Sequence, residues 1–139
     1  MVSVPERPQV VSAATLGAGV LTGGTLMLAG VVLESVANAR KQAAKAVNPG
    51  TLTTAGLFAR LRYPNYLGEI VFQLGLIVAT IAGAPGGWAL AAGSAGPLYI
   101  VILMYYAADD QDRQQAERYG QDATYQAWRR QSSSLVPGL

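Results

Sequence analysis

The sequence contains no cysteine and no histidine. Without cysteine there can be no disulfide, thiolate nucleophile or thiolate metal ligand, so the redox state of the compartment is undetermined. Without histidine, Ser-His and Cys-His catalysis and His-ligated zinc are excluded. Any acid or base in this protein must therefore be Asp, Glu, Lys or Tyr, and the sequence identifies no catalytic residue.

Charged residues are also scarce, at 13% of the 139 residues, whereas 51% of the residues are hydrophobic. An average soluble domain carries about 25% charged residues. The length suits one domain, residues 1–139, and the net charge of +2 leads us to expect no nucleic-acid partner. We predict an all-α, integral membrane helical bundle in contact with the lipid bilayer.

Charge-free runs locate the membrane crossings. Residues 8–33 and 70–108 contain no charged residue, and about 20 apolar residues suffice for one helical crossing. The second run is long enough for two crossings and is interrupted by the sequence GAPGG at 83–87. The prediction is three transmembrane helices, at about residues 10–33, 66–82 and 88–108. The polar tail, 109–139, is predicted to form two short helices that separate near Gly120.

The basic residues predict the orientation. All lysines and arginines except Arg7 follow either the first or the third span, so they lie on the same side of the membrane. The positive-inside rule makes that side cytoplasmic. Glu6 beside a single Arg7 is a poor basic region for a signal peptide, which favours a first segment that spans the membrane. We expect a multi-pass protein with a cytoplasmic basic loop and C-terminal tail.

Glycines in the first span allow two interpretations. A dinucleotide-binding loop needs a strand before the glycines and a soluble helix after them, and neither is evident here. Gly19 and Gly23 have the spacing that lets membrane helices approach closely. We therefore expect these glycines to pack against a neighbouring helix.

A polar stripe continues from the end of the first span. Glu34, Asn38, Lys41 and Lys45 recur at intervals of four, three and four residues, so they share one helix face. A solvated helix surface is the simple interpretation. Against it, an unpaired carboxylate at the membrane boundary is costly. The sequence Asn48-Pro49-Gly50 is expected to end this helix.

The sequence Arg62-Tyr63-Pro64-Asn65-Tyr66-Leu67-Gly68-Glu69 concentrates polar groups before an apolar run. Pro64 suits the first position of a helix, which places Asn65 and Glu69 one turn apart on one face. A carboxylate just inside a span needs partners. We expect the partners of Glu69 to be Asn65, Arg62 or the helix face that carries Glu34 and Asn38. Arg60 and Arg62 either extend to lipid phosphates or bind a cofactor phosphate.

An acidic cluster formed by Asp109, Asp110 and Asp112 opens the tail. Such clusters hold Mg²⁺ and a diphosphate in some membrane enzymes. A single cluster is weak support, and acidic residues are favoured at a helix N-terminus in any case. We predict no metal site.

The segment 62–69 resembles the Arg-His-Pro-Asn-Tyr-x-Gly-Glu signature of the membrane family that includes steroid 5-alpha-reductases, sterol reductases and bacterial relatives, with Tyr63 in place of the usual histidine. Isoprenylcysteine carboxyl methyltransferases share a shorter version. The similarity extends through Gly86-Gly87-Trp88, Gly96-Pro97-Leu98 and Ser134-Leu135-Val136-Pro137, and covers the chain from about Gly30 onward.

The resemblance implies an NADPH-dependent reductase that acts on a carbon–carbon double bond of a lipid or steroid-like substrate. It implies cofactor binding by Asn65, Glu69, Glu34, Asn38, Arg62 and Tyr66. It also implies that the chain corresponds to the C-terminal half of longer relatives, so that a substrate-binding half, a second copy or a partner would complete it. Two alternatives remain open: an S-adenosylmethionine-dependent methyltransferase of the isoprenylcysteine type, and a non-catalytic helix bundle.

Overall fold

The structure is a computed structural model that describes residues 12–84 and 86–137. Within these residues the elements are α1 (Ala13–Val47), the short 3-10 helix η1 (Gly56–Ala59), α2 (Pro64–Gly83), α3 (Gly87–Tyr119) and α4 (Ala123–Gln131). This described part contains no named strand, so the predicted all-α class is confirmed.

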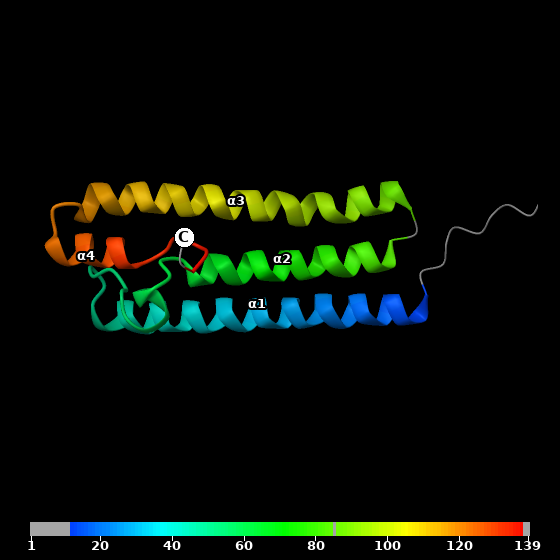
Figure 1. Cartoon of the computed structure of the whole chain (residues 1–139). Coiled ribbons are helices and arrows are strands. Elements are labelled where there is room, and N and C mark those ends of the chain that lie inside the picture. Colours follow the sequence, from blue (N-terminus) through cyan, green and yellow to red (C-terminus); the bar gives the residue numbers. More distant parts are fainter. Residues whose placement is uncertain (1–11, 85, 138–139) are drawn as a thin grey trace, which may run out of the picture.

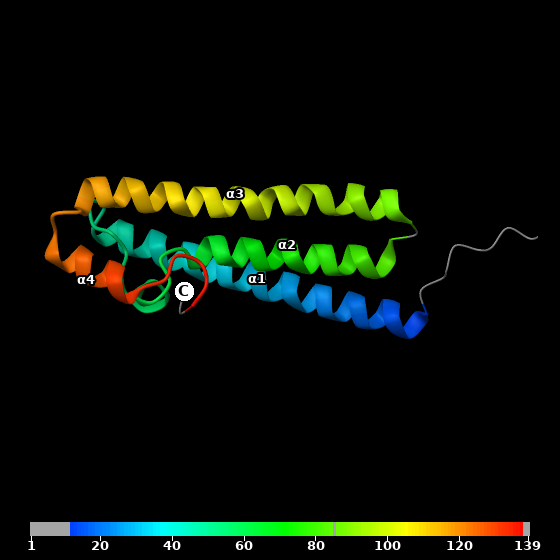
Figure 2. The same ribbon diagram turned by 45° about the horizontal axis from the view of Figure 1, so that its top comes forward.

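The three long helices lie side by side with alternating direction, and α2 is the middle one in both Figure 1 and Figure 2. The helix contacts agree with this order, because α2 packs against α1 on one side and α3 on the other. The short helix α4 lies beyond the start of α2, at the end of the bundle away from the start of α1 (Figure 1). The polar residues of the chain gather at this end.

Helices α1, α2 and α3 are each long and apolar enough to cross a membrane, as predicted. The predicted start of the first span at residue 10 lies outside the described residues. Helices α1 and α3 continue past their apolar parts as polar helix. The first of the two predicted tail helices is therefore a continuation of α3, and only α4 is separate. A helix continues where no proline or glycine stops it, and none occurs between Pro97 and Gly120.

The helix ends follow the local sequence. The side chain of Ser12 caps α1 by accepting a hydrogen bond from the backbone N–H of Thr15 at 3.1 Å. Helix α1 ends at Asn48, before Pro49 and Gly50, as expected. Pro64 begins α2, where its missing N–H costs no hydrogen bond.

Close backbone contact joins α1 to α2. A Cβ atom placed on Gly30 would lie 2.5 Å from the carbonyl oxygen of Gly68, and one placed on Gly23 would lie 2.6 Å from that of Gly75. Gly19 abuts Ala82 in the same way. The predicted packing role of Gly19 and Gly23 is confirmed. Since α1 is continuous helix through these glycines, they form no nucleotide-binding loop.

The C-terminal segment packs against the residues that precede α2. The backbone N–H of Arg62 donates to the carbonyl of Ser133 at 2.8 Å, and that of Tyr63 donates to Ser134 at 3.2 Å. The indole N–H of Trp128 donates to the carbonyl of Phe58 at 2.7 Å. The end of the chain therefore fixes the entry into α2.

Candidate functional site

The polar stripe lies on one continuous helix. Glu34, Asn38, Lys41 and Lys45 all belong to α1, so their predicted common face is preserved. At 1.5 Å of rise per residue, Glu34 and Lys45 are separated by roughly 16 Å along the axis. The stripe leads from the apolar part of α1 to the basic end of the bundle.

Glycine packing brings the α2 carboxylate to this stripe. A Cβ atom on Gly68 would lie 2.6 Å from the backbone nitrogen of Glu34, so the two helices touch here. The carboxyl groups of Glu34 and Glu69 are neighbours and interact electrostatically. Two ionised carboxylates this close repel each other, so the pair is costly without a hydrogen-bond donor nearby.

The neighbouring pair follows from the antiparallel arrangement. One turn along α1 leads from Glu34 to Asn38, and one turn back along α2 leads from Glu69 to Asn65. Asn38 and Asn65 thus occupy the next level of the same helix pair, and both are half-buried. The structure therefore places Glu34 beside Glu69, with Asn38 and Asn65 at the adjacent level of α1 and α2.

Glu69 has a further partner that the prediction missed. The side-chain amide of Gln73 donates to Oε1 of Glu69 at 2.8 Å. Its position one turn further along α2 is visible in the sequence, because residues four apart share a helix face. Glu69 is therefore held between Glu34 and Gln73, and the expectation that this carboxyl group needs partners is supported.

Tyr66 lies on the side of α2 that faces the core. Its ring stacks on Tyr63 with a centroid distance of 5.4 Å, and it packs against the buried cluster of Tyr63, Ile70, Ala108 and Leu135. The structure thus assigns Tyr66 packing contacts at the start of α2 and toward α3.

Arg62 occupies a different environment from the one predicted. Its Nε donates to Oδ1 of Asp112 at 2.9 Å, its Nη2 donates to Oδ2 at 3.2 Å, and its Nη1 donates to the carbonyl of Ser132 at 2.7 Å. The side chain is buried. A guanidinium engaged in this way neither extends to lipid nor binds a cofactor phosphate, so we reassign Arg62 from cofactor ligand to positioning residue.

Tyr63, at the position of the usual histidine, belongs to the same network. Its hydroxyl donates to Oδ1 of Asp112 at 2.6 Å. Burial, together with this carboxylate, raises the pKa of the Tyr63 phenol well above its ordinary value. Tyr63 is consequently a neutral hydrogen-bond donor in the folded protein.

The acidic cluster of α3 is divided between different partners. Asp112 also forms an ion pair with Arg129 at 3.1 Å, while Asp110 pairs with Arg113 at 3.3 Å. In residues 12–84 and 86–137, no group of three or more acidic residues converges on a point where it could hold a metal ion. Asp112 serves instead to join α3, α4 and the entry into α2.

A cationic pocket lies at the far end of the stripe. It has a volume of about 170 Å³, and its walls include Lys41 and Lys45 of α1, Thr53 of the following loop, and Gln111 and Arg118 of α3. The sequence shows the two lysines. It does not show that α3 brings Arg118 to them.

The fold and this site define a class: a membrane protein with three candidate spans and a line of acidic, amide and basic side chains at one end of the bundle. The chain belongs to the family described as "Protein of unknown function (DUF1295)", whose model matches residues 1–132. Comparisons with curated proteins and with solved structures gave no significant match.

Proposed function

We propose that this protein is an NADPH-dependent reductase module that acts on a carbon–carbon double bond of a lipid or steroid-like substrate. The observation that carries the proposal is the continuous line from the Glu34–Glu69 pair, past Asn38 and Asn65, to the cationic pocket. The resemblance of residues 62–69 to the signature of steroid 5-alpha-reductases supports the same conclusion.

The membrane end of the line fits a carboxamide. A primary amide offers two N–H donors and one acceptor oxygen, so it needs both acceptors and donors around it. The carboxyl groups of Glu34 and Glu69 supply acceptors, and the side-chain amides of Asn65 and Asn38 supply both donors and acceptors. When bound, the cofactor would supply a hydride from the ring that carries this amide.

The basic end fits the phosphates of the same molecule. Lys41, Lys45 and Arg118 line one pocket, and cationic side chains are the usual partners of phosphate oxygens. The separation of roughly 16 Å along α1 suits an extended dinucleotide better than a compact ligand. The residues present therefore fit NADPH in both charge and order.

The substrate would approach from the membrane. The outer face of α1 carries an open apolar hollow lined by Leu28, Val32, Val36 and Leu57, among others. Apolar surfaces of this kind accept hydrocarbon from lipid or a lipophilic molecule equally well. The proton donor must be Asp, Glu, Lys or Tyr, since the chain has no histidine.

The methyltransferase alternative is less compatible with the pocket. S-adenosylmethionine carries a sulfonium cation, one carboxylate and no phosphate, so three cationic side chains in line with the site suit it less well than they suit NADPH. The motif also favours the reductase, because the shorter methyltransferase version usually lacks the asparagine and the glutamate.

A binding comparison tests the proposal. The protein, purified in lipid nanodiscs, would be titrated with NADPH, NADH and S-adenosylmethionine by calorimetry. We expect saturable binding of NADPH and none of S-adenosylmethionine. Binding of S-adenosylmethionine alone would favour the methyltransferase, and binding of none of the three would favour the non-catalytic bundle.

A further inference from the structure

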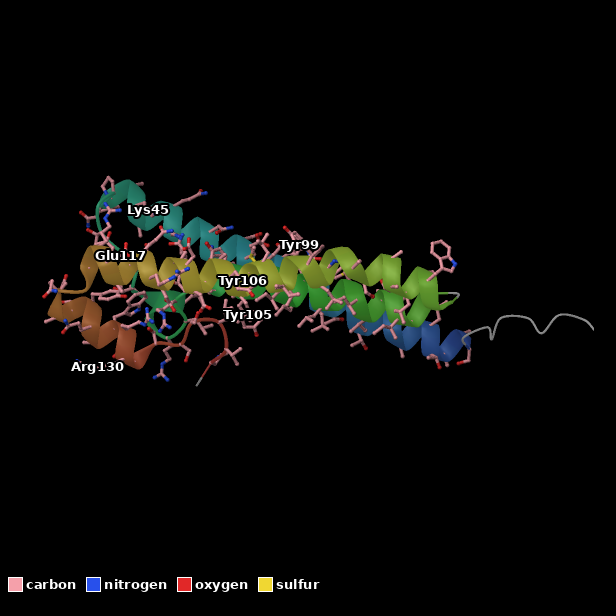
Figure 3. The ribbon with its side chains drawn as sticks, turned by 90° about the horizontal axis from the view of Figure 1, so that it is seen from above. Lys45, Tyr99, Tyr105, Tyr106, Glu117 and Arg130 are labelled. Carbon is pink, nitrogen blue, oxygen red and sulfur yellow. The ribbon has the colours of Figure 1, made fainter. Side chains whose placement is uncertain are left out.

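The cationic pocket contains more positive charge than the structure neutralises. In the described part of the chain, the acidic partners in ion pairs are Asp110 and Asp112, and their partners are Arg62, Arg113 and Arg129. Lys41, Lys45 and Arg118 form no ion pair there. Figure 3 shows Lys45, near the end of α1, and Arg130, of α4, on opposite sides of α3.

Two of these cations have an ordinary explanation. Lys45 and Arg118 lie in the last turns of α1 and α3, where the helix dipole favours positive charge. That explanation does not cover Lys41, which is one turn earlier on the same face as Lys45. Like charges at this spacing are mutually destabilising unless an anion lies between them.

One residue that lines the pocket also has a hydroxyl without a hydrogen-bond partner. Oγ1 of Thr53, in the loop after α1, is buried and has no hydrogen-bond partner. A buried polar atom without a partner is destabilising. A bound ligand oxygen would give this hydroxyl a partner once the Thr53 side chain turns toward the pocket.

We infer that this pocket binds a phosphate monoester, held by Lys41, Lys45 and Arg118 and accepting a hydrogen bond from Thr53. The volume of about 170 Å³ is below the 300–1,000 Å³ of pockets that enclose a whole drug-sized molecule, so it suits one phosphate group of a larger ligand. The monoester belongs either to a soluble nucleotide or to a lipid headgroup. In the nucleotide case the inference rests on the proposed function and makes the pocket the determinant of preference for NADPH over NADH.

The experiment uses probes that carry the phosphate but no nicotinamide. Binding of 2′,5′-ADP and of adenosine, which carries no phosphate, to the full-length protein in nanodiscs of neutral lipid would be compared by calorimetry. We expect 2′,5′-ADP to bind at least about tenfold more tightly, as one charge-assisted contact allows. Lys41→Gln and Lys45→Gln should each reduce the ratio of the two binding affinities. Thr53→Val should reduce this ratio less. Arg40→Gln is the matched control, because Arg40 lies on α1 outside the pocket lining.

A second arm distinguishes the two sources of phosphate. Nanodiscs that contain phosphatidylinositol 4-phosphate would be compared with neutral discs for thermal stabilisation of the protein, again with Lys41→Gln and Arg40→Gln. Stabilisation lost only in Lys41→Gln, without 2′,5′-ADP binding, would assign the site to a lipid headgroup. No Lys41-dependent binding of either probe would overturn the inference. Because neither probe contains nicotinamide, a failure of the Asn65 and Glu69 site would leave these results unchanged.

Discussion

The guanidinium of Arg62 donates two hydrogen bonds to the carboxylate of Asp112, at 2.9 and 3.2 Å, across 50 residues of sequence. The same carboxylate accepts a hydrogen bond from the hydroxyl of Tyr63 and forms an ion pair with Arg129. Parallel N–H···O bonds from a guanidinium fix orientation as well as distance. This one carboxylate therefore sets how α3, α4 and the first turn of α2, which carries Asn65, meet.

Asp112→Asn should destabilise the protein strongly. The substitution leaves the buried Arg62 without its counter-charge, and breaking one side of a buried ion pair costs about 3–5 kcal/mol. Thermal unfolding in detergent measures the effect. Asp110→Asn is the matched control on the same helix, since its pair with Arg113 is solvent-exposed and such pairs contribute about 0–1 kcal/mol. Equal effects of the two substitutions would contradict the role assigned to Asp112.

The raised pKa of Tyr63 predicts a loss of stability at high pH. The unfolded chain releases the phenol proton near the ordinary pKa of 10.0, while the folded protein retains it. The unfolded state then binds fewer protons, so the free energy of unfolding falls as the pH rises above about 10. Unfolding midpoints measured from pH 8 to 11 should show a smaller decline in Tyr63→Phe. The exposed Tyr106, changed to Phe, should leave the decline unaltered.

Gly30→Ala should separate α1 from α2. A methyl group there meets backbone atoms of Gly68 and Phe72, which cannot move aside as a side chain can. Overpacking of this kind costs about 1–3 kcal/mol. Gly24→Ala is the control, because a Cβ atom at Gly24 meets nothing within 4 Å. The difference in thermal stability between the two variants measures the contact, and equal stability would show that the helices do not touch at Gly30.

The sequence predicted the features that depend on local chemistry. The charge-free runs located three helices, Pro64 and Asn48 marked helix ends, and the spacing of Gly19 and Gly23 indicated helix packing. Each of these signals lies within about one helix turn of the feature that it predicts. The four-residue spacing of Glu69 and Gln73 was equally readable but was missed.

Long-range pairings were not predictable in the same way. Arginine is a residue type that commonly binds phosphate. Only the fold shows that the N–H groups of Arg62 are already hydrogen-bonded to Asp112 and to the carbonyl of Ser132. Arg118 is likewise an ordinary surface arginine until α3 places it beside Lys41. Sequence spacing describes faces within one helix, whereas these contacts depend on how separate helices pack.

The predicted orientation can be tested directly, because the chain has no native cysteine. Single cysteines at Lys45 and Gln131 should react with a membrane-impermeant thiol reagent from the cytosol. A cysteine at Ala84, in the turn after α2, should react from the opposite side. This follows from the positive-inside rule applied to the basic residues near α1 and α3. Labelling of positions 45 and 84 from one side would contradict the three-span topology.

Glu69→Gln should weaken NADPH binding while leaving the fold nearly intact. The amide retains the size of the carboxyl group and can still bond to Gln73, but it loses the charge offered to the cofactor. A hydrogen bond to a charged group contributes roughly 1.5–3 kcal/mol, which is about 10- to 150-fold in Kd. Asn65→Ala should behave in the same way. Each variant would be measured both by calorimetry with NADPH and by thermal unfolding. The two measurements separate loss of binding from loss of stability.

The double variant decides whether the two residues share one site. Residues that act on one ligand couple, so Glu69→Gln combined with Asn65→Ala should lose less binding free energy than the sum of the single losses. Gln73→Ala is a control from the same helix face, because Gln73 contacts Glu69 from the side away from Asn65. It should weaken binding less than Glu69→Gln does. Unchanged NADPH affinity in Glu69→Gln, together with a lower unfolding temperature, would make the Glu34–Glu69 pair a structural contact and remove the main support for the reductase proposal.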